Sequence, residues 1–464
     1  MTLIKSISGI RGTIGGAPSQ NLTPIDVVKY SSAYAVWLKE TLPAESYTVV
    51  LGRDARVSGA MLISLVSSSL QGCGIHVIDL GLATTPTTEM AVTDFKAQGG
   101  IILTASHNPA QWNALKLLNE KGEFLSAAAG ARILEIAEQE SFSYADIQSL
   151  GEYKEYKDIN QKHIDAILRL DLVDTAAIRK AGFKVAIDCV NSVGGVIIPD
   201  LLKQLGVAEI VELYCEANGL FPHNPEPLPE NLTELAKVIK KQGADAGFVV
   251  DPDVDRLAIL NEDGSMFGEE YTLVAVADYV LKSRGGGNTV SNLSSTGALR
   301  DITQKHGGQY EAAAVGEVNV VEKMKQIGAV IGGEGNGGVI YPELHYGRDA
   351  LAGIALFLSH LAKSGMKCSK LRASYPNYVI SKNKLELTPG TDVEKLLSKV
   401  KDKYSGQPII DIDGVKIHFD KEWVHLRKSN TEPVIRVYAE SQSKEKADAL
   451  AEKIIGDIKT LGKL

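Results

Sequence analysis

A polar loop follows an apolar run near residue 100 and carries a serine beside a histidine. Ile101–Leu103 is apolar, and residues 104–109 read T-A-S-H-N-P. The run predicts a short buried strand, and the Asn-Pro pair predicts a turn after it. Ser106 would then face a cleft, which makes it a candidate nucleophile or phosphate carrier. A turn whose polar side chains only satisfy their own backbone is the alternative that this loop alone leaves open.

Three aspartates stand at alternate positions after a second apolar run. Residues 251–256 read D-P-D-V-D-R, so Asp251, Asp253 and Asp255 carry like charges at close spacing. Such carboxylates repel one another and need a cation to be stable together. Hard oxygen ligands favour Mg²⁺, with Ca²⁺ as the alternative. An EF-hand is excluded because Arg256 occupies the place of its glycine, whereas a solvated acidic turn remains the competing interpretation.

A glycine-rich loop is the third feature with chemical potential. Residues 332–338 read G-G-E-G-N-G-G, and Arg348 and Asp349 follow ten residues later. Glycines bring the backbone close to a ligand, while Glu334 and Asn336 can bond vicinal hydroxyls. The spacing is not the G-x-G-x-x-G of a dinucleotide site, and a flexible turn is the simpler alternative.

A basic turn near the end of the chain is the fourth feature. Residues 427–433 read R-K-S-N-T-E-P, and Arg436 follows. Two arginines, a lysine and two hydroxyls around one turn suit a phosphate, although an exposed basic turn would have the same composition.

Strands and helices alternate in the segments that must position these loops. Residues 48–51 and 75–78 read as strands, with a helix from Ser58 to Gly72 between them. A small residue, a short buried strand and a polar loop recur at 99–109, 246–256 and 328–338. This repetition predicts three related α/β domains in tandem.

The last ninety residues have a different character and predict a small α+β domain. We expect a charged helix from Lys384 onward, strands at 415–419 and 423–426, and a closing helix at about 444–461. The predicted fold class is therefore α/β, with three tandem mixed-sheet domains and a C-terminal α+β domain around a central cleft. The predicted limits are 1–155, 156–262, 263–372 and 373–464.

Composition excludes several classes of partner. The 464-residue chain carries a formal net charge of −8, which argues against binding to nucleic acid or to an anionic membrane. The four cysteines are far apart in the sequence, so reduced thiols and no zinc site are expected. The chain shows neither a signal-peptide pattern nor a run of eighteen apolar residues, and a cytoplasmic location is expected.

The four loops, taken together and in this order, closely resemble the α-D-phosphohexomutases. That family moves phosphate between the 1- and 6-positions of a hexose, and its phosphoserine, metal, sugar and phosphate loops match T-A-S-H-N-P, D-P-D-V-D-R, G-E-G-N-G and R-K-S-N-T-E-P. The resemblance implies that Ser106 is phosphorylated and binds one Mg²⁺ per chain together with Asp251, Asp253 and Asp255.

The resemblance also assigns the remaining site residues. Arg11 and Lys116 would lie near the transferred phosphate, with Lys116 as general acid or base, and His107 follows the serine as in relatives. Arg256 would offset oxyanions, and Glu334 and Asn336 would bind the sugar. The non-reacting phosphate would be held by Arg427, Ser429, Asn430, Thr431 and Arg436, on a domain that closes as a lid.

The implied reaction interconverts hexose 6-phosphate and hexose 1-phosphate through a bisphosphorylated sugar that turns around in the cleft. A hexose 1,6-bisphosphate would serve as activator, the partners would be small sugar phosphates, and the chain would be a monomer or homodimer. The glycine-rich sugar loop favours glucosamine phosphate, with phosphomannomutase/phosphoglucomutase activity as the alternative.

Proteins of other classes share parts of this pattern. A haloacid-dehalogenase-type phosphatase needs Thr or Val at position 255, and a serine hydrolase needs a G-x-S-x-G elbow that the Ser106 loop lacks. A non-catalytic sugar-phosphate sensor could keep all four loops and remains a third alternative.

Overall fold

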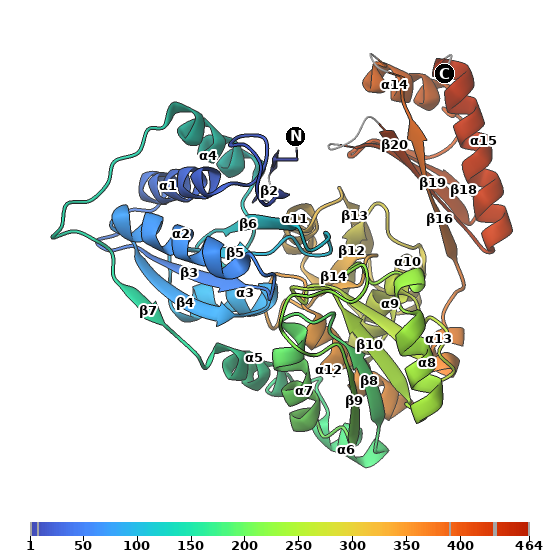
Figure 1. The fold of residues 1–464 in the computed structure, drawn as a ribbon. Helices are drawn as coiled ribbons and strands as arrows, with labels where there is room; N and C mark the ends of the chain where they lie inside the picture. The colour runs from blue at the N-terminus through green and yellow to red at the C-terminus, as the bar shows by residue number, and fades with distance from the viewer. Residues whose placement is uncertain (1, 7–8, 389–390, 430–433, 463–464) are drawn as a thin grey trace. The chain divides into compact units, whose positions relative to one another are not determined.

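The structure is a computed structural model that describes residues 2–6, 9–388, 391–429 and 434–462 (Figure 1). It divides into two compact units. The first comprises Met1–Tyr279 and Asn336–Leu371, and the second comprises Val280–Gly335 and Arg372–Leu464. No helix in these described ranges is both long and apolar enough to cross a membrane.

A seven-stranded mixed sheet forms the N-terminal part of the first unit, in the order β1-β2-β6-β5-β3-β4-β7. β5, β3, β4 and β7 are parallel, whereas β6, β2 and β1 continue the sheet antiparallel. The strands are β1 Ile4–Ser6, β2 Gly9–Thr13, β3 Thr48–Arg53, β4 His76–Leu82, β5 Gly99–Leu103, β6 Trp112–Leu118 and β7 Tyr153–Glu155. The accompanying helices are α1 Pro24–Thr41, α2 Gly59–Gly72, α3 Thr85–Asp94, α4 Ala127–Gln139 and α5 Ile159–Leu168.

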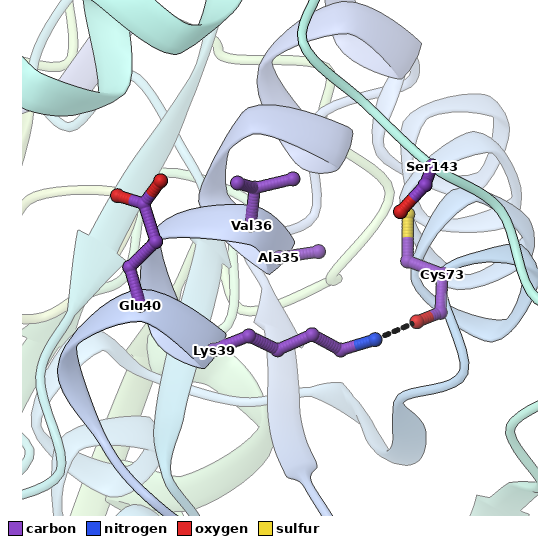
Figure 2. A pocket seen from close by; sticks show the side chains of 6 residues that line it. All are labelled: Ala35, Val36, Lys39, Glu40, Cys73 and Ser143. Atoms are coloured by element: carbon purple, nitrogen blue, oxygen red, sulfur yellow. Dashed lines mark hydrogen bonds between the residues drawn. The ribbon is translucent and has the colours of Figure 1, made fainter.

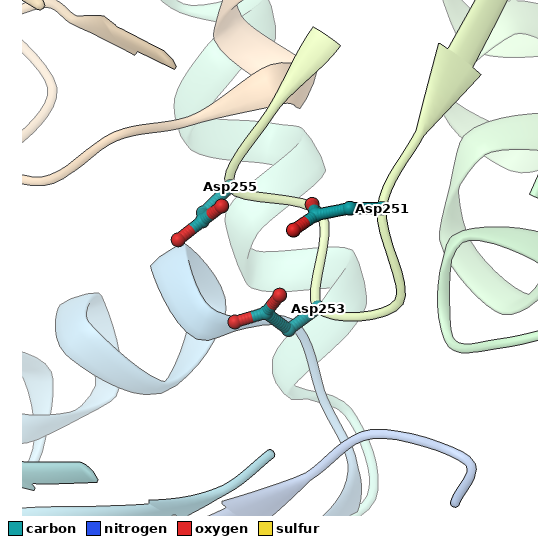
Figure 3. Close-up of side chains that lie close together, drawn as sticks. All are labelled: Asp251, Asp253 and Asp255. Carbon is teal, nitrogen blue, oxygen red and sulfur yellow. The ribbon is translucent and has the colours of Figure 1, made fainter. Parts of the chain in front are cut away.

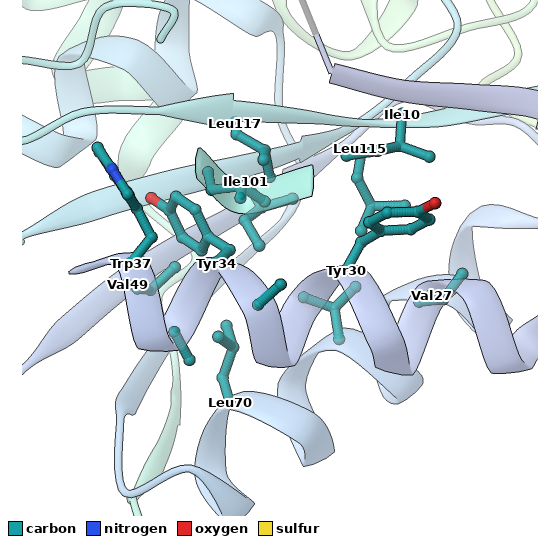
Figure 4. Close-up of a cluster of buried hydrophobic side chains, with 14 of the residues drawn as sticks. Ile10, Val27, Tyr30, Tyr34, Trp37, Val49, Leu70, Ile101, Leu115 and Leu117 are labelled. Atoms are coloured by element: carbon teal, nitrogen blue, oxygen red, sulfur yellow. The ribbon is translucent and has the colours of Figure 1, made fainter. Parts of the chain in front are cut away.

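Helix α1 fixes the part of this sheet that presents the Ser106 loop. It begins at Pro24, after the N-cap residue Thr23, and Asp26 completes a capping box. Its Tyr30 and Tyr34 pack toward the strands in the buried cluster of Figure 4, and the Tyr34 hydroxyl donates to the Leu118 carbonyl oxygen at 2.6 Å. Burial of each such side chain stabilises the fold by about 1.5–3 kcal/mol. The strands β5 and β6 that flank the Ser106 loop are therefore firmly held.

The second sheet of the first unit has the order β11-β10-β8-β9. β9, β8 and β10 are parallel, and β11 runs antiparallel to β10, so the 251–256 loop is the connection of a hairpin. The elements are α6 Thr175–Ala181, β8 Lys184–Asp188, α7 Gly194–Leu205, β9 Glu209–Leu213, η1 Pro229–Asn231, α8 Thr233–Gln242, β10 Ala246–Val250 and β11 Leu257–Asn261. Later segments include α9 Glu269–Arg284, β15 Gly338–Ile340, the buried α12 Ala350–Ser364 and α13 Cys368–Ala373.

The second unit contains a parallel sheet and an antiparallel sheet. β12 pairs in parallel with β13 and β14, and the elements are β12 Asn288–Asn292, α10 Ala298–Lys305, β13 Tyr310–Ala313, α11 Glu317–Ile327 and β14 Ala329–Glu334. The C-terminal sheet has the order β16-β20-β19-β18-β17, and α14 and α15 share its core. Its elements are β16 Val379–Glu386, α14 Val393–Lys403, β17 Ile409–Ile410, β18 Val415–Phe419, β19 Glu422–Lys428, β20 Val434–Ser441 and α15 Lys444–Gly462.

The predicted helix from Lys384 onward is wrong. Residues 379–386 form β16, which pairs with β20 along its whole length, and the helix begins only at Val393. Leu385 is buried between the exposed Lys384 and Glu386, so this stretch alternates as a strand does once β20 lies beside it. The strand before the glycine-rich loop is also longer than predicted, because β14 extends through Glu334.

The predicted fold class is confirmed, because mixed α/β sheets precede a C-terminal α+β segment. The predicted strands at 415–419 and 423–426 and the closing helix also lie where the sequence pattern indicated. One sheet falls largely in each predicted range, but the exact domain limits stay a prediction.

Candidate active site

Ser106 lies directly beyond β5 and contacts a residue 145 positions further along the chain. Its hydroxyl donates to Asp251 Oδ2 at 2.6 Å, and its amide donates to Thr104 Oγ1 at 2.9 Å. The residue is 7% exposed, and its backbone is left-handed with φ 48°. A serine held in this sparsely populated conformation points its hydroxyl toward the aspartate loop instead of along the strand.

Arg56 holds the Ser106 loop in shape and was not among the predicted site residues. It is the largest fully buried side chain in the described ranges, and its Nε donates to Asp54 Oδ2 at 3.0 Å. Its terminal nitrogens donate at 2.5–3.0 Å to the carbonyl oxygens of Ser106, Asn108, Pro109 and Trp112. The planar guanidinium thus uses its fixed fork of donors on one loop. In the sequence, Arg56 is the second arginine of G-R-D-A-R at residues 52–56, and this motif could have identified it.

The three aspartates of the β10–β11 loop are fully buried and point toward one another (Figure 3). Asp251, Asp253 and Asp255 each offer one oxygen, and these oxygens lie within 4.8 Å of one another. Val254 between them has φ 63°, an unfavourable value for a β-branched residue. The amide of Ala350 donates to the Val254 carbonyl oxygen at 3.2 Å and holds this turn from outside.

Three cationic side chains balance the aspartates. Lys116 Nζ lies 2.7 Å from Asp253 and 3.7 Å from Asp255, and Arg348 contacts Asp255 Oδ2 at 2.6 Å. Arg256 Nε lies 3.9 Å from Asp251 and 3.7 Å from Asp255. Sequence reasoning placed Arg348 with the glycine-rich loop, but its guanidinium serves the aspartate loop.

These contacts set different protonation tendencies within one cluster. Burial, followed by the charges of Asp255 and Asp253, raises the pKa of Asp251 well above its ordinary value. Burial would also raise the pKa of Asp253, but Lys116 outweighs it and the pKa lies below the ordinary value. Burial would lower the pKa of Lys116, but the two aspartates outweigh it and the pKa is raised. The two aspartates therefore keep Lys116 in its protonated, ammonium form.

The donor set of this loop fits a hard divalent cation. Asp253 Oδ1 and Asp255 Oδ1 are buried and have no hydrogen-bond partner among the described residues. Buried carboxylate oxygens without partners are costly, and a cation would satisfy them. Oxygen-only ligands, together with the Ser106 oxygen within reach of Asp251, match the preference of Mg²⁺.

Positive charge also gathers beside Ser106. His107 Nδ1 lies 3.4 Å from Ser106 Oγ, and Arg11 on β2 reaches Asn108 Oδ1 at 3.5 Å. The charge of Arg256, then burial, then the charge of Arg11 lower the pKa of His107 well below its ordinary value. Burial and Arg256 also lower the pKa of Arg11. Cationic groups that disfavour one another's charge form a site that an anion would relieve.

The predicted sugar residues belong to different units. Glu334 ends β14 in the second unit and accepts hydrogen bonds from Asn292 Nδ2 at 2.8 Å and from the Gly316 amide at 3.1 Å. Asn336 belongs to the first unit, where its Oδ1 accepts from the Gly338 amide at 3.2 Å. Gly337 has φ 88°, and a Cβ there would lie 2.4 Å from the Leu257 carbonyl oxygen. Only glycine can therefore bring this loop against the start of β11.

The predicted phosphate residues include two arginines directly opposite each other. Arg427 on β19 pairs in register with Arg436 on β20, which pairs in register with Lys384 on β16. Residues paired in this way share one face, so these three form a cationic row across adjacent strands. Arg427 Nε contacts Asp413 Oδ2 at 2.8 Å. Lys384 was missed because its segment was predicted as a helix.

Of the three further predicted phosphate residues, the structure describes only Ser429, directly after β19. The Ser429 amide donates to the Val434 carbonyl oxygen at 3.0 Å and so continues the β19–β20 pairing. Asn430 and Thr431 lie outside the described residues.

A cavity of about 240 Å³ near α1 does not belong to this site (Figure 2). Its lining comprises Ala35, Val36, Lys39, Glu40, Cys73 and Ser143, none of which is a predicted site residue. The Lys39 ammonium already donates to the Cys73 carbonyl oxygen at 2.5 Å. The cavity therefore offers no chemistry comparable with the Ser106 and aspartate loops.

Comparison with known proteins identifies the family. The sequence matches all four phosphoglucomutase/phosphomannomutase domains: the alpha/beta/alpha domains I, II and III at residues 3–144, 161–264 and 268–378, and the C-terminal domain at 382–456. The chain belongs to this family, the α-D-phosphohexomutases, and is an isomerase that interconverts sugar phosphates.

Individual relatives cover nearly the whole chain. A phosphoglucomutase/phosphomannomutase of Thermococcus kodakarensis is 37% identical over 94% of this chain and 95% of its own length. A phosphoglucosamine/phosphogalactosamine mutase of Sulfurisphaera tokodaii is 32% identical over 96% of this chain and 97% of its own. The crystal structure of a phosphoglucomutase/phosphomannomutase family protein from Burkholderia thailandensis superposes with a TM-score of 0.85, at 25% identity, over 99% of this chain and 98% of the other.

Proposed function

We propose that this chain interconverts hexose 6-phosphate and hexose 1-phosphate through a phosphoserine at Ser106 and a bisphosphorylated sugar. The contact of 2.6 Å between Ser106 Oγ and Asp251 is the observation that carries the proposal. It joins a hydroxyl that can accept a phosphoryl group to a loop that can hold a cation beside it. Phosphoryl transfer asks the protein mainly for such placement and for neutralisation of charge.

Each transfer has a place for its proton. When phosphoryl moves from the sugar to Ser106, the sugar O–P bond breaks and a bond forms between phosphorus and Ser106 Oγ. The Ser106 hydroxyl gives its proton to Asp251, which already accepts its hydrogen bond, and the leaving sugar oxygen needs a proton of its own. Asp253 and Asp255 keep Lys116 protonated, so we assign Lys116 as the acid that supplies it. In the reverse transfer a sugar O–P bond forms as the Ser106 O–P bond breaks, the sugar hydroxyl gives its proton to Lys116, and Ser106 Oγ takes its proton back from Asp251.

Charge neutralisation falls to the groups around the serine. Arg11, His107 and Arg256 would face the phosphate oxygens, and Asp251, Asp253, Asp255 and Ser106 would hold one Mg²⁺. When bound, that ion would act as a Lewis acid on the transferred phosphoryl group. An N-acetylphosphoglucosamine mutase of Aspergillus fumigatus with the same fold was solved with GlcNAc-6P and magnesium. A serine-to-alanine variant of that enzyme was solved with glucose 1,6-bisphosphate. Both ligands agree with the proposed ion and intermediate.

The other end of the sugar phosphate needs its own anchor. We assign Arg427 and Arg436 to the non-reacting phosphate, together with Ser429, Asn430 and Thr431, which follow Arg427 in the sequence. Glu334 and Asn336 would bind the sugar hydroxyls, and the segment 373–464 would act as the phosphate-binding lid.

We further propose glucosamine 6-phosphate and glucosamine 1-phosphate as the preferred pair. The glycine-rich loop G-E-G-N-G supports this preference, as does the 32% identity to the phosphoglucosamine/phosphogalactosamine mutase. Phosphoglucomutase/phosphomannomutase activity is the second candidate, because the T. kodakarensis relative of that name is 37% identical. Coupled assays with glucosamine 6-phosphate, mannose 1-phosphate and glucose 1-phosphate decide between them. A clear preference for the neutral hexoses would overturn the glucosamine assignment.

Intact-mass measurement tests the phosphoserine itself. The chain should gain one phosphate on incubation with a hexose 1,6-bisphosphate, on the peptide that contains Ser106, and Ser106→Ala should abolish both the gain and turnover. Turnover that survives Ser106→Ala would move the phosphorylated group to an aspartate, as in a phosphatase of the haloacid-dehalogenase type. No phosphate and no bisphosphate activation in the wild type would favour a sensor.

A further inference from the structure

A network of buried polar side chains begins at Asp253 of the aspartate loop and ends at Asp255 of the same loop. It starts at Asp253, passes through the first turn of α3, reaches α5 and then the N-terminus of α12, and returns to Asp255. All of these segments belong to the first unit. This network joins helices that are more than 250 residues apart in the sequence.

The first half of this network holds Asp253 in place through the start of α3. The Thr85 amide and hydroxyl donate to the Asp253 carbonyl oxygen at 2.9 Å and to Asp253 Oδ2 at 2.6 Å. The neighbouring Thr84 caps α3, and its hydroxyl is 2.6 Å from that of Thr87. Thr87 Oγ1 then lies 2.8 Å from Nδ1 of His163 on α5.

The second half holds Asp255 and the turn before it. His163 Nε2 lies 2.9 Å from Asp349 Oδ2, while Asp349 Oδ1 caps α12 by accepting from the amides of Leu351 and Ala352. On either side of Asp349, Arg348 contacts Asp255 and the Ala350 amide donates to Val254. The position of Asp349 therefore sets where two anchors of the aspartate loop lie.

The surroundings leave this arrangement little freedom. His345 Nε2 lies 3.3 Å from Asp349 Oδ2, and its Nδ1 lies 3.5 Å from Glu89. A Cβ on Gly347 would lie 1.8 Å from a Glu89 oxygen, so a larger residue there would have to displace the Glu89 carboxylate. His163 and Asp349 are each 1% exposed, so water cannot readily replace a missing partner.

We infer that His163 and Asp349 are positioning residues that hold the aspartate loop in the shape that binds a divalent cation. The inference rests on the proposed function, because it assigns a role toward the proposed cation. Groups that orient metal ligands in this way typically change metal affinity or activity by about 10- to 100-fold when mutated.

Direct binding of Mn²⁺ to the full chain tests the inference, with free Mn²⁺ measured by electron paramagnetic resonance. Asp349→Asn keeps the oxygen that caps α12 but presents an amide to His163, and His163→Gln shortens the link to Thr87. Each should raise the dissociation constant of Mn²⁺ about 10-fold. The matched control is His360→Gln. His360 is a buried histidine on α12, the helix that Asp349 caps, and its Nε2 lies 3.7 Å from Asp278. The control should bind as the wild type does.

A milder variant covers the case in which those changes prevent folding. Thr87→Val keeps the side-chain shape and removes the hydroxyl that meets His163, and it should weaken Mn²⁺ binding by about 3-fold while circular dichroism stays unchanged. Wild-type affinity in Thr87→Val and in a folded Asp349→Asn would overturn the inference. A wild-type chain that binds no Mn²⁺ would instead refute the proposed metal site, so the two failures are distinguishable.

Discussion

The two regions assigned to phosphate differ in how their charges are balanced. Around Ser106, buried aspartates lie against Lys116 and Arg348, and the loop carbonyls are occupied by Arg56. On the C-terminal sheet, Lys384 and Arg436 are exposed and stand in register with Arg427, which contacts Asp413. Like charges directly opposite each other destabilise a sheet. Contacts within the protein thus hold the Ser106 loop in shape, whereas the cationic row lacks such contacts from the described residues at Lys384 and Arg436 and would gain stability from a bound anion.

This comparison predicts its largest effect at Arg56. Arg56→Lys has too few donors for the four loop carbonyls, and each buried acceptor left without a partner costs about 1–3 kcal/mol. We expect roughly 3 kcal/mol of lost stability and about a 100-fold lower kcat, measured by urea unfolding and a coupled assay. The control Arg132→Lys alters an exposed arginine that pairs with Glu40, and it should change neither quantity. A fully active Arg56→Lys would show that the loop keeps its shape unaided.

The next effect is expected at Arg436. If Arg436 binds phosphate as proposed, Arg436→Ala would remove a charge-assisted hydrogen bond worth about 1.5–3 kcal/mol. KM for the sugar phosphate should rise about 10-fold or more, with a smaller change in kcat. Lys446→Ala on the exposed side of α15 is the control. An unchanged KM for Arg436→Ala would end the assignment of the cationic row to phosphate.

A smaller effect, on stability at low pH, is expected at His425, a buried residue on the sheet face that carries the cationic row. His425 lies two residues before Arg427, and burial is the main cause that lowers its pKa to about 4 from an ordinary value of 6.5. The folded state then binds fewer protons than the unfolded state, so stability falls as the pH drops below about 6.5. We expect a loss of about 1 kcal/mol at pH 5.5 relative to pH 7.5.

Urea unfolding at the two pH values measures this loss. Trp423 fluorescence reports on the sheet if Trp37 and Trp112 are replaced by phenylalanine. His425→Gln should lower the pH dependence by that amount, and an equal dependence in both chains would contradict the prediction.

The smallest effect is expected at Lys384, at the exposed end of the row. Lys384→Ala should raise KM only about 3-fold, because an exposed charge is worth under about 1 kcal/mol, and salt should remove most of the difference. Lys382→Ala is a matched control on the same face of β16, opposite Tyr438 instead of Arg436. Equal effects of the two variants would mean that net charge, and not the row, governs binding.

Local patterns sufficed to predict the strands that lead into the two candidate loops. Ser106 and the aspartates follow short apolar runs, and these runs are indeed the buried strands β5 and β10. The same holds for the start of α1, where Thr23, Pro24 and Asp26 are a local signal. Residues whose role depends on their own neighbours in sequence could therefore be identified early.

Contacts between distant segments could not be predicted in this way. Arg348 was grouped with the glycine-rich loop beside it in sequence, but it contacts Asp255, 93 residues away. Lys384 was assigned to a charged helix because the only buried residue in its stretch, Leu385, gives no clear alternation without the partner strand β20. Partner strands and counter-charges are set by tertiary structure, which overrides local propensity.

The left-handed backbone at Val254 has a consequence for how the protein is made. A β-branched residue at this φ costs about 1–3 kcal/mol, and the hydrogen bond that holds it comes from Ala350. A nascent chain that already includes Ser106, Asp251, Asp253 and Asp255 thus still lacks the Ala350 amide that fixes the turn at Val254. The turn that sets the spacing of the three carboxylates would therefore be fixed only after synthesis has passed residue 350, late in the making of the chain.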